Sequence, residues 1–244
     1  MSRLNEIKCL EKLISSYFHN DGLKIDFDNS DSYSTKVFLS SLKENKDNNK
    51  FPDFVFDEGI AEHFLVSSSN ETRKGSSYKI EENINKEKAK EGFAKADEDF
   101  KSSPYSPNTF SIAKSYEEYE GFSYNNFCDS FKKNFIRHYN SLIKSPYTNK
   151  TVAFLIEQQD SRLSIWKNDV CLRFYCLSED KNLLLFLKAY SNEIRYIFFV
   201  QIDGIEIIDL KGIDKLLEKS KDDLDIRGGQ SKHITLKLYI DLPN

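Results

Sequence analysis

Apolar residues recur at helical spacing in two parts of the chain. Between residues 3 and 18, leucine, isoleucine and aromatic side chains return every three or four positions, and glutamate and lysine occupy positions between them. This stripe predicts an amphipathic helix that ends at Asn20-Asp21-Gly22. A longer stripe of the same kind covers residues 123–144, and Pro146 ends it.

Other apolar runs have the length expected of β-strands. Residues 151–156 form a continuous apolar run, which is typical of a strand buried on both faces. Residues 35–42 fit either a strand or a short helix. The pattern predicts an α/β protein with a mixed central sheet flanked by helices, built as a single elaborated domain over residues 1–244. Further strands are expected at 170–177, 194–202, 205–210 and 233–241, and helices at 179–191 and 211–221.

Residues 67–115 interrupt this pattern. The segment opens with a hydroxyl-rich run and continues with many Glu and Lys residues but few apolar ones. It predicts a polar, charged insertion that is mobile and partly helical. Arg73 and Lys74, beside Gly75 and several hydroxyl groups, could bind a phosphate. A solvated loop would have the same composition.

Residues 52–66 predict a β-hairpin that carries one carboxylate on each strand. If Glu58-Gly59 form a two-residue turn, Asp53 pairs with Phe64. Because side chains alternate along a strand, Asp53 and Glu62 are then diagonal neighbours on one face. Two carboxylates at this range can hold a hard divalent cation. The alternative is a hairpin whose polar face meets water.

This hairpin resembles the core of the PD-(D/E)xK nuclease superfamily, in which a Pro-Asp on one strand and a Glu-x-Lys on the next assemble a magnesium site. Pro52-Asp53 matches the first motif, and Glu62 matches the acidic residue of the second. The expected order of elements over residues 3–157 is also similar to the superfamily's α-β-β-β-α-β core. The resemblance implies a restriction-endonuclease-like fold and metal-dependent phosphodiester hydrolysis.

The resemblance also implies roles for individual residues. Asp53 and Glu62 would ligate Mg²⁺ or Mn²⁺, and the backbone carbonyl of His63 would face the ion. The His63 side chain should point to the opposite face, as a core histidine would. The first helix of the superfamily sometimes adds an acidic residue, for which Glu6 or Glu11 could serve, although both also fit a solvated helix face.

Position 64 departs from the superfamily pattern. Phe64 stands where the family has a lysine, which is the usual partner of the attacking water. Lys74 is the first candidate for a substitute cation, followed by Arg73, because both come directly after the Glu62 strand. Lys133 and Arg137 on the long helix are further candidates.

The composition restricts which binding partners and which cellular compartment are expected. The net charge is −4, so nucleic-acid binding must depend on a local basic patch or on a metal. The four cysteines form no CxxC pair, which indicates buried, reduced thiols. No apolar run approaches the ~20 residues of a membrane span, and no signal peptide is recognisable. A cytoplasmic protein without a membrane partner is expected.

These observations favour a Mg²⁺-dependent nuclease of bacterial or phage type, acting in restriction, phage defence or repair, with DNA preferred over RNA as the nucleic acid. Phe64 and the acidic net charge favour a second hypothesis, a non-catalytic binding or immunity-type protein that has a protein partner. An enzyme acting on a small phosphoester is a third. The oligomeric state, a homodimer included, stays open.

Overall fold

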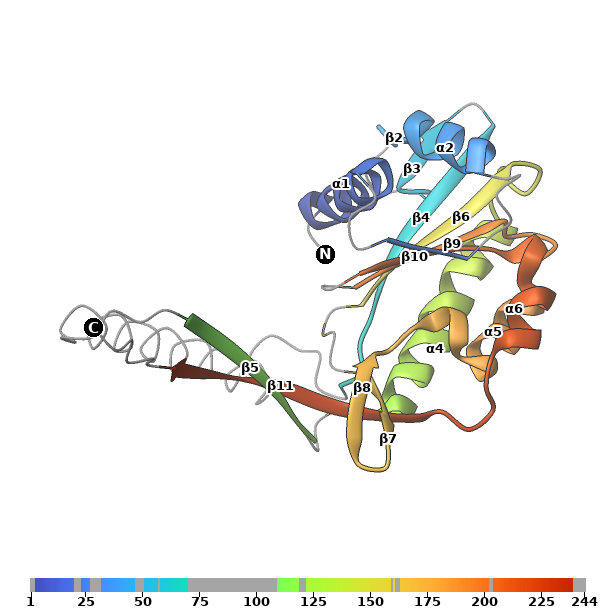
Figure 1. Ribbon diagram of the computed structural model, residues 1–244. Helices are drawn as coiled ribbons and strands as arrows, with labels where there is room; N and C mark the ends of the chain where they lie inside the picture. The colour runs from blue at the N-terminus through green and yellow to red at the C-terminus, as the bar shows by residue number, and fades with distance from the viewer. Residues whose placement is uncertain are drawn as a thin grey trace.

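The computed structural model describes residues 3–19, 23–26, 32–46, 51–56, 58–69, 109–118, 122–158, 160, 163–201 and 204–238. Within these ranges seven strands form one mixed sheet in the order β1-β10-β9-β6-β4-β3-β2 (Figure 1). The predicted α/β fold with a mixed central sheet flanked by helices is confirmed. The strands are β1 (Leu23–Asp26), β2 (Lys43–Glu44), β3 (Phe54–Phe56), β4 (Gly59–Val66), β6 (Thr151–Gln158), β9 (Tyr196–Val200) and β10 (Ile205–Asp209).

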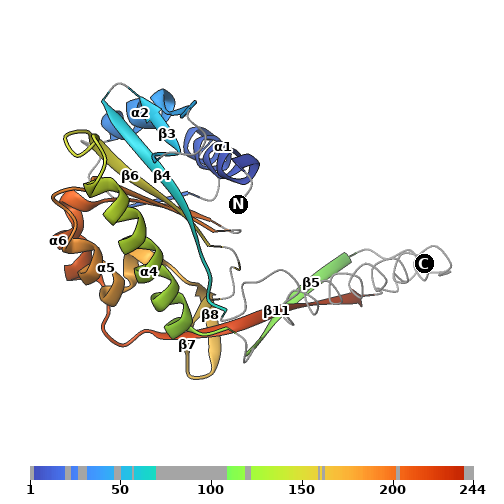
Figure 2. The ribbon, with the colours of Figure 1, turned by 180° about the vertical axis from the view of Figure 1, so that it is seen from behind.

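Helices cover both faces of this sheet (Figures 1 and 2). Two separate apolar cores result, one on each face. None of the described helices is both long enough and apolar enough to cross a membrane. One face carries α1 (Arg3–His19) and α2 (Ser32–Ser41), and the other carries α4 (Tyr124–Ile143), α5 (Lys181–Lys188) and α6 (Ile213–Lys219), with short 3₁₀ turns at Leu177–Glu179 and Leu210–Gly212.

The two predicted amphipathic helices are confirmed as α1 and α4. The hydroxyl of Ser123 accepts a hydrogen bond from the backbone N–H of Asn126, which caps the first turn of α4. Residues 35–42, for which a strand and a helix were both open, belong mostly to α2. The strands predicted at 194–202 and 205–210 are present as β9 and β10, which pair antiparallel.

Strand β4 is the centre of the part of the fold that carries the candidate site. It pairs antiparallel with β3 on one edge and parallel with β6 on the other. Helix α4 makes the connection toward β6 and packs on β4. Alternate residues of β4 therefore face the α4 core and the α1 core, and both faces of the strand are buried.

The register of the β3–β4 hairpin differs from the predicted one. Phe56 lies opposite Gly59, so the loop falls between these two residues instead of at Glu58-Gly59. If this register continues by one more residue, Asp53 lies opposite Glu62. The sequence had predicted that Asp53 would lie opposite Phe64. Glycine is required at position 59, because a Cβ atom there would lie 2.0 Å from Cε1 of Phe56.

A second sheet has the strand order β5-β11-β7-β8 within the described residues. Its two longest strands, β5 and β11, form an antiparallel ladder that extends away from the main sheet (Figures 1 and 2). The strands β1, β2, β5 and β7 were not predicted. Of the predicted insertion at 67–115, residues 70–108 lie outside the described ranges. The strands of this sheet are β5 (Thr109–Glu118), β7 (Leu163–Lys167), β8 (Val170–Phe174) and β11 (Asp225–Leu238).

Phe135 is the residue of α4 whose truncation we expect to destabilise the fold most clearly. Its ring is fully buried and contacts Phe64, Phe154 and Phe186. Phe135→Ala should lower the free energy of unfolding by about 3–5 kcal/mol, because it leaves a cavity between α4 and the sheet. Ile136→Ala, at the exposed neighbouring position, should cost less than about 1 kcal/mol. Urea denaturation measures both; equal losses would contradict the packing of α4 described above.

Candidate functional site

Asp53 and Glu62 form a closely linked pair at the open end of the β3–β4 hairpin. The backbone N–H of Asp53 donates to Oε2 of Glu62 over 3.1 Å. The backbone N–H of His63 donates to Oδ2 of Asp53 over 2.8 Å. Glu62 is buried and Asp53 is partly buried. The two carboxylates therefore lie close together, as predicted. They are closer than the diagonal neighbours that the sequence predicted, because the hairpin register, continued by one residue, brings Asp53 opposite Glu62.

A histidine of α4 completes this group. Nδ1 of His138 lies 2.6 Å from Oε1 of Glu62, and its Nε2 lies 2.9 Å from an Nη atom of Arg137. A guanidinium can only donate, so Nε2 of His138 accepts and its proton resides on Nδ1, which donates to Glu62. Burial and the neighbouring Arg137 lower the pKa of His138 to about 4. The imidazole is therefore neutral at pH 7 and holds the Glu62 side chain in one orientation.

The two carboxyl groups share an environment that disfavours their charged forms. Burial, followed by the charge of Glu62, raises the pKa of Asp53 to about 6. Burial raises the pKa of Glu62 to about 7, although hydrogen bonds from Asp53 oppose that rise. Two carboxylates held together out of water behave in this way when no cation compensates them. The pair would gain from a bound divalent cation.

The pair opens into a cleft of about 790 Å³ between β4 and α4. Helix α4 lines the cleft with a polar stripe at helical spacing, adjacent to its apolar stripe. Glu6, from the first turn of α1, also reaches the cleft, and its charge contributes to the raised pKa of Glu62. The α4 residues of the stripe are Asn126, Asp129, Ser130, Lys133, Asn134, Arg137 and His138.

Phe64 lies on the same face of β4 as Glu62 but belongs to the core. Its side chain is buried and packs edge-on against the rings of Phe135 and Phe154. The imidazole of His138 stacks on it, with 4.8 Å between ring centroids and 15° between the planes. A lysine at this position would leave its ammonium group among these rings. The aromatic core thus explains why a phenylalanine is accommodated at position 64.

The cations proposed from the sequence fall into two groups. Arg73 and Lys74, the first candidates, lie outside the described residues. Lys133 and Arg137 both line the cleft, are exposed, and form no ion pair with a carboxylate of the described residues. The side chain of His63 points away from the cleft, as expected, because its Nε2 lies 2.9 Å from Oε2 of Glu157 on the other face of the sheet.

His138 was not among the site residues predicted from the sequence. The signal that could have found it is the polar stripe of α4, whose members recur every three or four residues beside the apolar stripe; this pattern marks a helix face that meets a cleft instead of open solvent. Glu6 was named as a candidate acidic residue of the first helix, through the resemblance to the nuclease superfamily, with a solvated helix face as the alternative. The structure places Glu6 at the cleft wall, a position that depends on how α1 packs on the sheet.

The hydroxyl-rich start of the predicted insertion has a structural role. The hydroxyls of Ser67 and Ser68 donate to the two carboxylate oxygens of Asp160 over 2.6 and 2.7 Å. The backbone N–H of Ser68 adds a third bond to the same carboxylate. These residues are buried, so the end of β4 is fixed against the segment that follows β6. Ser67 and Ser69 nevertheless contribute to the cleft wall.

Comparisons of the chain with protein-family models, with curated proteins and with solved structures found no match.

The carboxylate pair should make the stability of the protein depend on pH. The folded pKa of Asp53, about 6, lies above the value of about 3.9 for an unfolded aspartate. Its contribution to stability is thus present below pH 4 and is lost as the pH rises through 6. Asp53→Asn keeps the acceptor for the His63 N–H but has no charge. The mutant should gain about 1–3 kcal/mol relative to the parent between pH 4 and pH 8 without divalent ions.

Urea denaturation at a series of pH values measures this difference. The matched control is Asp129→Asn, which removes an exposed carboxylate from the wall of the same cleft. Because Asp129 is exposed, this replacement should change the free energy of unfolding by less than about 0.5 kcal/mol. A pH-independent difference for Asp53→Asn would show that Asp53 is not desolvated in the folded protein.

Proposed function

We propose that the cleft between β4 and α4 is the active site of a divalent-metal-dependent phosphodiester hydrolase, a nuclease. The observation that carries this proposal is the largely buried pair of Asp53 and Glu62, which shares the cleft with the exposed cations Lys133 and Arg137. Carboxylates for a hard cation and basic side chains for a phosphate are the two requirements of metal-assisted phosphoryl chemistry.

The donor set fits a magnesium or manganese ion. Asp53 and Glu62 supply carboxylate oxygens, and Glu6 supplies a third carboxylate at the cleft wall. A divalent ion held by these carboxylates would polarise a phosphoryl oxygen and would lower the pKa of a bound water. The His63 N–H positions Asp53, and His138 positions Glu62. The carbonyl of His63 is a further candidate ligand.

Lys133 and Arg137 take the role that the superfamily assigns to its motif lysine. Both lie on α4 one turn apart, and both side chains meet the cleft. Their charges would stabilise the negative charge that develops on the phosphoryl oxygens. Arg73 and Lys74 remain candidates for the same role from the segment beyond β4. The chain order from α1 to β6 is α1, β1, α2, β2, β3, β4, β5, α4, β6. The resemblance to PD-(D/E)xK nucleases gains support from α1, β2, β3, β4, α4 and β6, which follow the core order with β4 and β6 parallel, although β1, α2 and β5 interrupt it and residues 35–42, a strand in the expected order, belong mostly to helix α2.

The substrate proposed is nucleic acid, with DNA favoured over RNA. The net charge of −4 offers no general attraction for polyanions, so contacts must come from the cleft and the bound ion. A bacterial or phage protein of this kind would act in the cytoplasm, in restriction, phage defence or repair. If the site has lost its catalytic activity, the protein would be a binding protein with the same fold. Metal binding and DNA cleavage distinguish the nuclease from the binding protein.

Metal binding is the first requirement of the proposal. Titration calorimetry with Mg²⁺ or Mn²⁺ should show binding to the parent and none to the double variant Asp53→Asn, Glu62→Gln. At 100 times the dissociation constant, the ion should stabilise the parent by about 2.7 kcal/mol against urea. Asp129→Asn should bind as the parent does. Absence of binding to the parent would favour a non-catalytic binding protein.

The cations of α4 should affect chemistry more than metal affinity. Lys133→Ala and Arg137→Ala should each lower the rate of DNA cleavage with saturating Mn²⁺ by about 10²-fold, because each removes a preorganised positive charge. The metal dissociation constant should stay within about twofold of the parent value. Lys132→Ala is the matched control, because Lys132 donates to Asn182 and does not line the cleft.

The assay should compare duplex DNA, single-stranded DNA, RNA and the small ester bis(p-nitrophenyl) phosphate. Cleavage of the small ester alone would favour an enzyme acting on small phosphoesters. Binding of DNA in Ca²⁺ without cleavage, followed by cleavage in Mn²⁺, would support the nuclease. Unchanged rates in the Lys133 and Arg137 variants would leave the cationic role to Arg73 and Lys74.

A further inference from the structure

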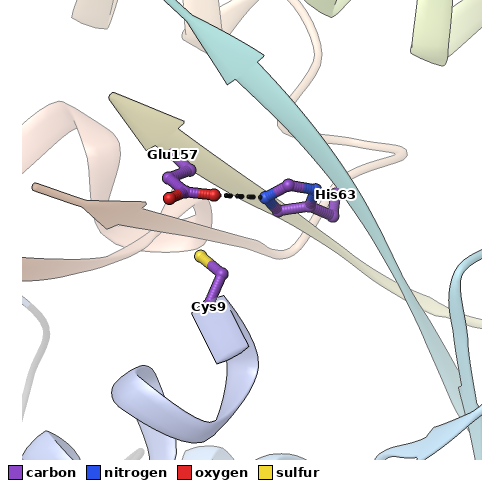
Figure 3. A group of neighbouring side chains, drawn as sticks. All are labelled: Cys9, His63 and Glu157. Atoms are coloured by element: carbon purple, nitrogen blue, oxygen red, sulfur yellow. Dashed lines mark hydrogen bonds and ion pairs between the residues drawn. The ribbon is translucent and has the colours of Figure 1, made fainter. Parts of the chain in front are cut away.

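Three side chains from different elements meet on the face of β4 opposite the cleft. They are Cys9 of α1, His63 of β4 and Glu157 of β6 (Figure 3). One ligand atom of each lies within 4.8 Å of the other two. Within the described part of the chain, this group alone brings three potential metal ligands so close together. It is separate from the carboxylate pair, although Glu62 and His63 are neighbours in sequence.

The main-chain pairing explains why these residues meet. Strands β4 and β6 are parallel, with Leu65 opposite Glu157. His63 precedes Leu65 by two positions and so faces the same side, diagonal to Glu157. Helix α1 covers this side of the sheet (Figure 1). Cys9 lies on the buried face of this helix. The placement thus follows from the same register that turns Glu62 toward the cleft.

We propose that Cys9, His63 and Glu157 form a second metal site, suited to Zn²⁺ or a similar borderline-soft divalent ion. Thiolate, imidazole and carboxylate are the side-chain ligands of zinc, and magnesium does not favour the first two. The site goes beyond the nuclease proposed above and does not depend on it. Three protein ligands leave the fourth tetrahedral position for water or another ligand.

The present geometry is close to that of a tetrahedral site. Metal–ligand distances of 2.0–2.3 Å place neighbouring ligand atoms about 3.3–3.8 Å apart. Nε2 of His63 is now 2.9 Å from Oε2 of Glu157, and all three ligand atoms lie within 4.8 Å of one another. Shifts of about 1 Å would therefore close the site. The side chain of Glu157 is 32% exposed, whereas the His63 ring is fully buried, so an ion would enter on the Glu157 side.

Binding requires a defined change in protonation. Burial and the Glu157 carboxylate raise the pKa of Cys9, so the thiol is protonated without a metal. The thiol proton would pass to solvent as the sulfur–metal bond forms. The imidazole proton that Nε2 now shares with Glu157 would move to Nδ1, which has no hydrogen-bond partner among the described residues. One proton is released for each ion bound.

Cobalt(II) reports the site directly, because thiolate coordination gives a near-ultraviolet charge-transfer band and tetrahedral geometry gives strong visible bands. The parent protein should show both during a Co²⁺ titration, and Zn²⁺ should abolish them while Mg²⁺ should not. Cys9→Ser should lose the charge-transfer band. Glu157→Gln keeps an acceptor for His63 and should lower Co²⁺ affinity at least tenfold.

Two controls separate this site from the rest of the molecule. Cys171→Ser, in strand β8, and Asp129→Asn, in the cleft wall, should both leave the Co²⁺ spectrum unchanged. A parent spectrum without a charge-transfer band would overturn the proposal, as would a band that survives Cys9→Ser. If Cys9→Ser does not fold, Glu157→Gln decides, and unchanged affinity in that variant would also overturn it. Neither result depends on whether the cleft binds magnesium or cleaves DNA.

Discussion

The double pairing of β4 is the constraint on which the rest of the site depends. The strand is hydrogen-bonded to β3 on one edge and to β6 on the other, so it can neither slip nor rotate. Its alternating side chains are therefore assigned to two different cores. Glu62 must face α4, and His63 must face α1. Both side chains are largely buried, so each needs a partner within the fold.

This constraint lowers the stability of the folded protein but prepares the site for binding. Glu62 receives bonds from Asp53 and His138, yet burial still raises its pKa to about 7. A fold selected for stability alone would place an apolar residue there. Burial of a charged group is typical of functional sites, where charges are positioned before the ligand binds. The neutral state of His138 fits the same view, because a charged imidazole would compensate Glu62 without a metal.

The sequence predicted the elements better than their register and their contacts. Helices α1 and α4 and strand β6 were predictable because their apolar patterns are long and uninterrupted. The hairpin register was wrong because the turn residues around Gly59 allow two positions of the loop. The shift is of two residues and preserves the alternation, so Asp53 and Glu62 still share a face. Strand β7 was missed because its pairing depends on β11, far along the chain. The contact of His138 with Glu62 likewise depends on how α4 packs, which no local pattern determines.

Position 64 shows that a sequence motif read alone can differ in meaning from the same residues in the fold. Read alone, Phe64 in place of lysine indicates a lost activity. In the fold, Phe64 supports the His138 ring that orients Glu62, and α4 brings Lys133 and Arg137 to the same cleft. Under the proposed function, the cationic role expected at position 64 would pass to α4, while Phe64 itself packs in the core. The two faces of β4 also differ in donor chemistry, with the two carboxyl groups of Asp53 and Glu62 toward α4 and a thiol, an imidazole and a carboxylate toward α1. Hard and borderline ions would for this reason separate between the two faces without competing.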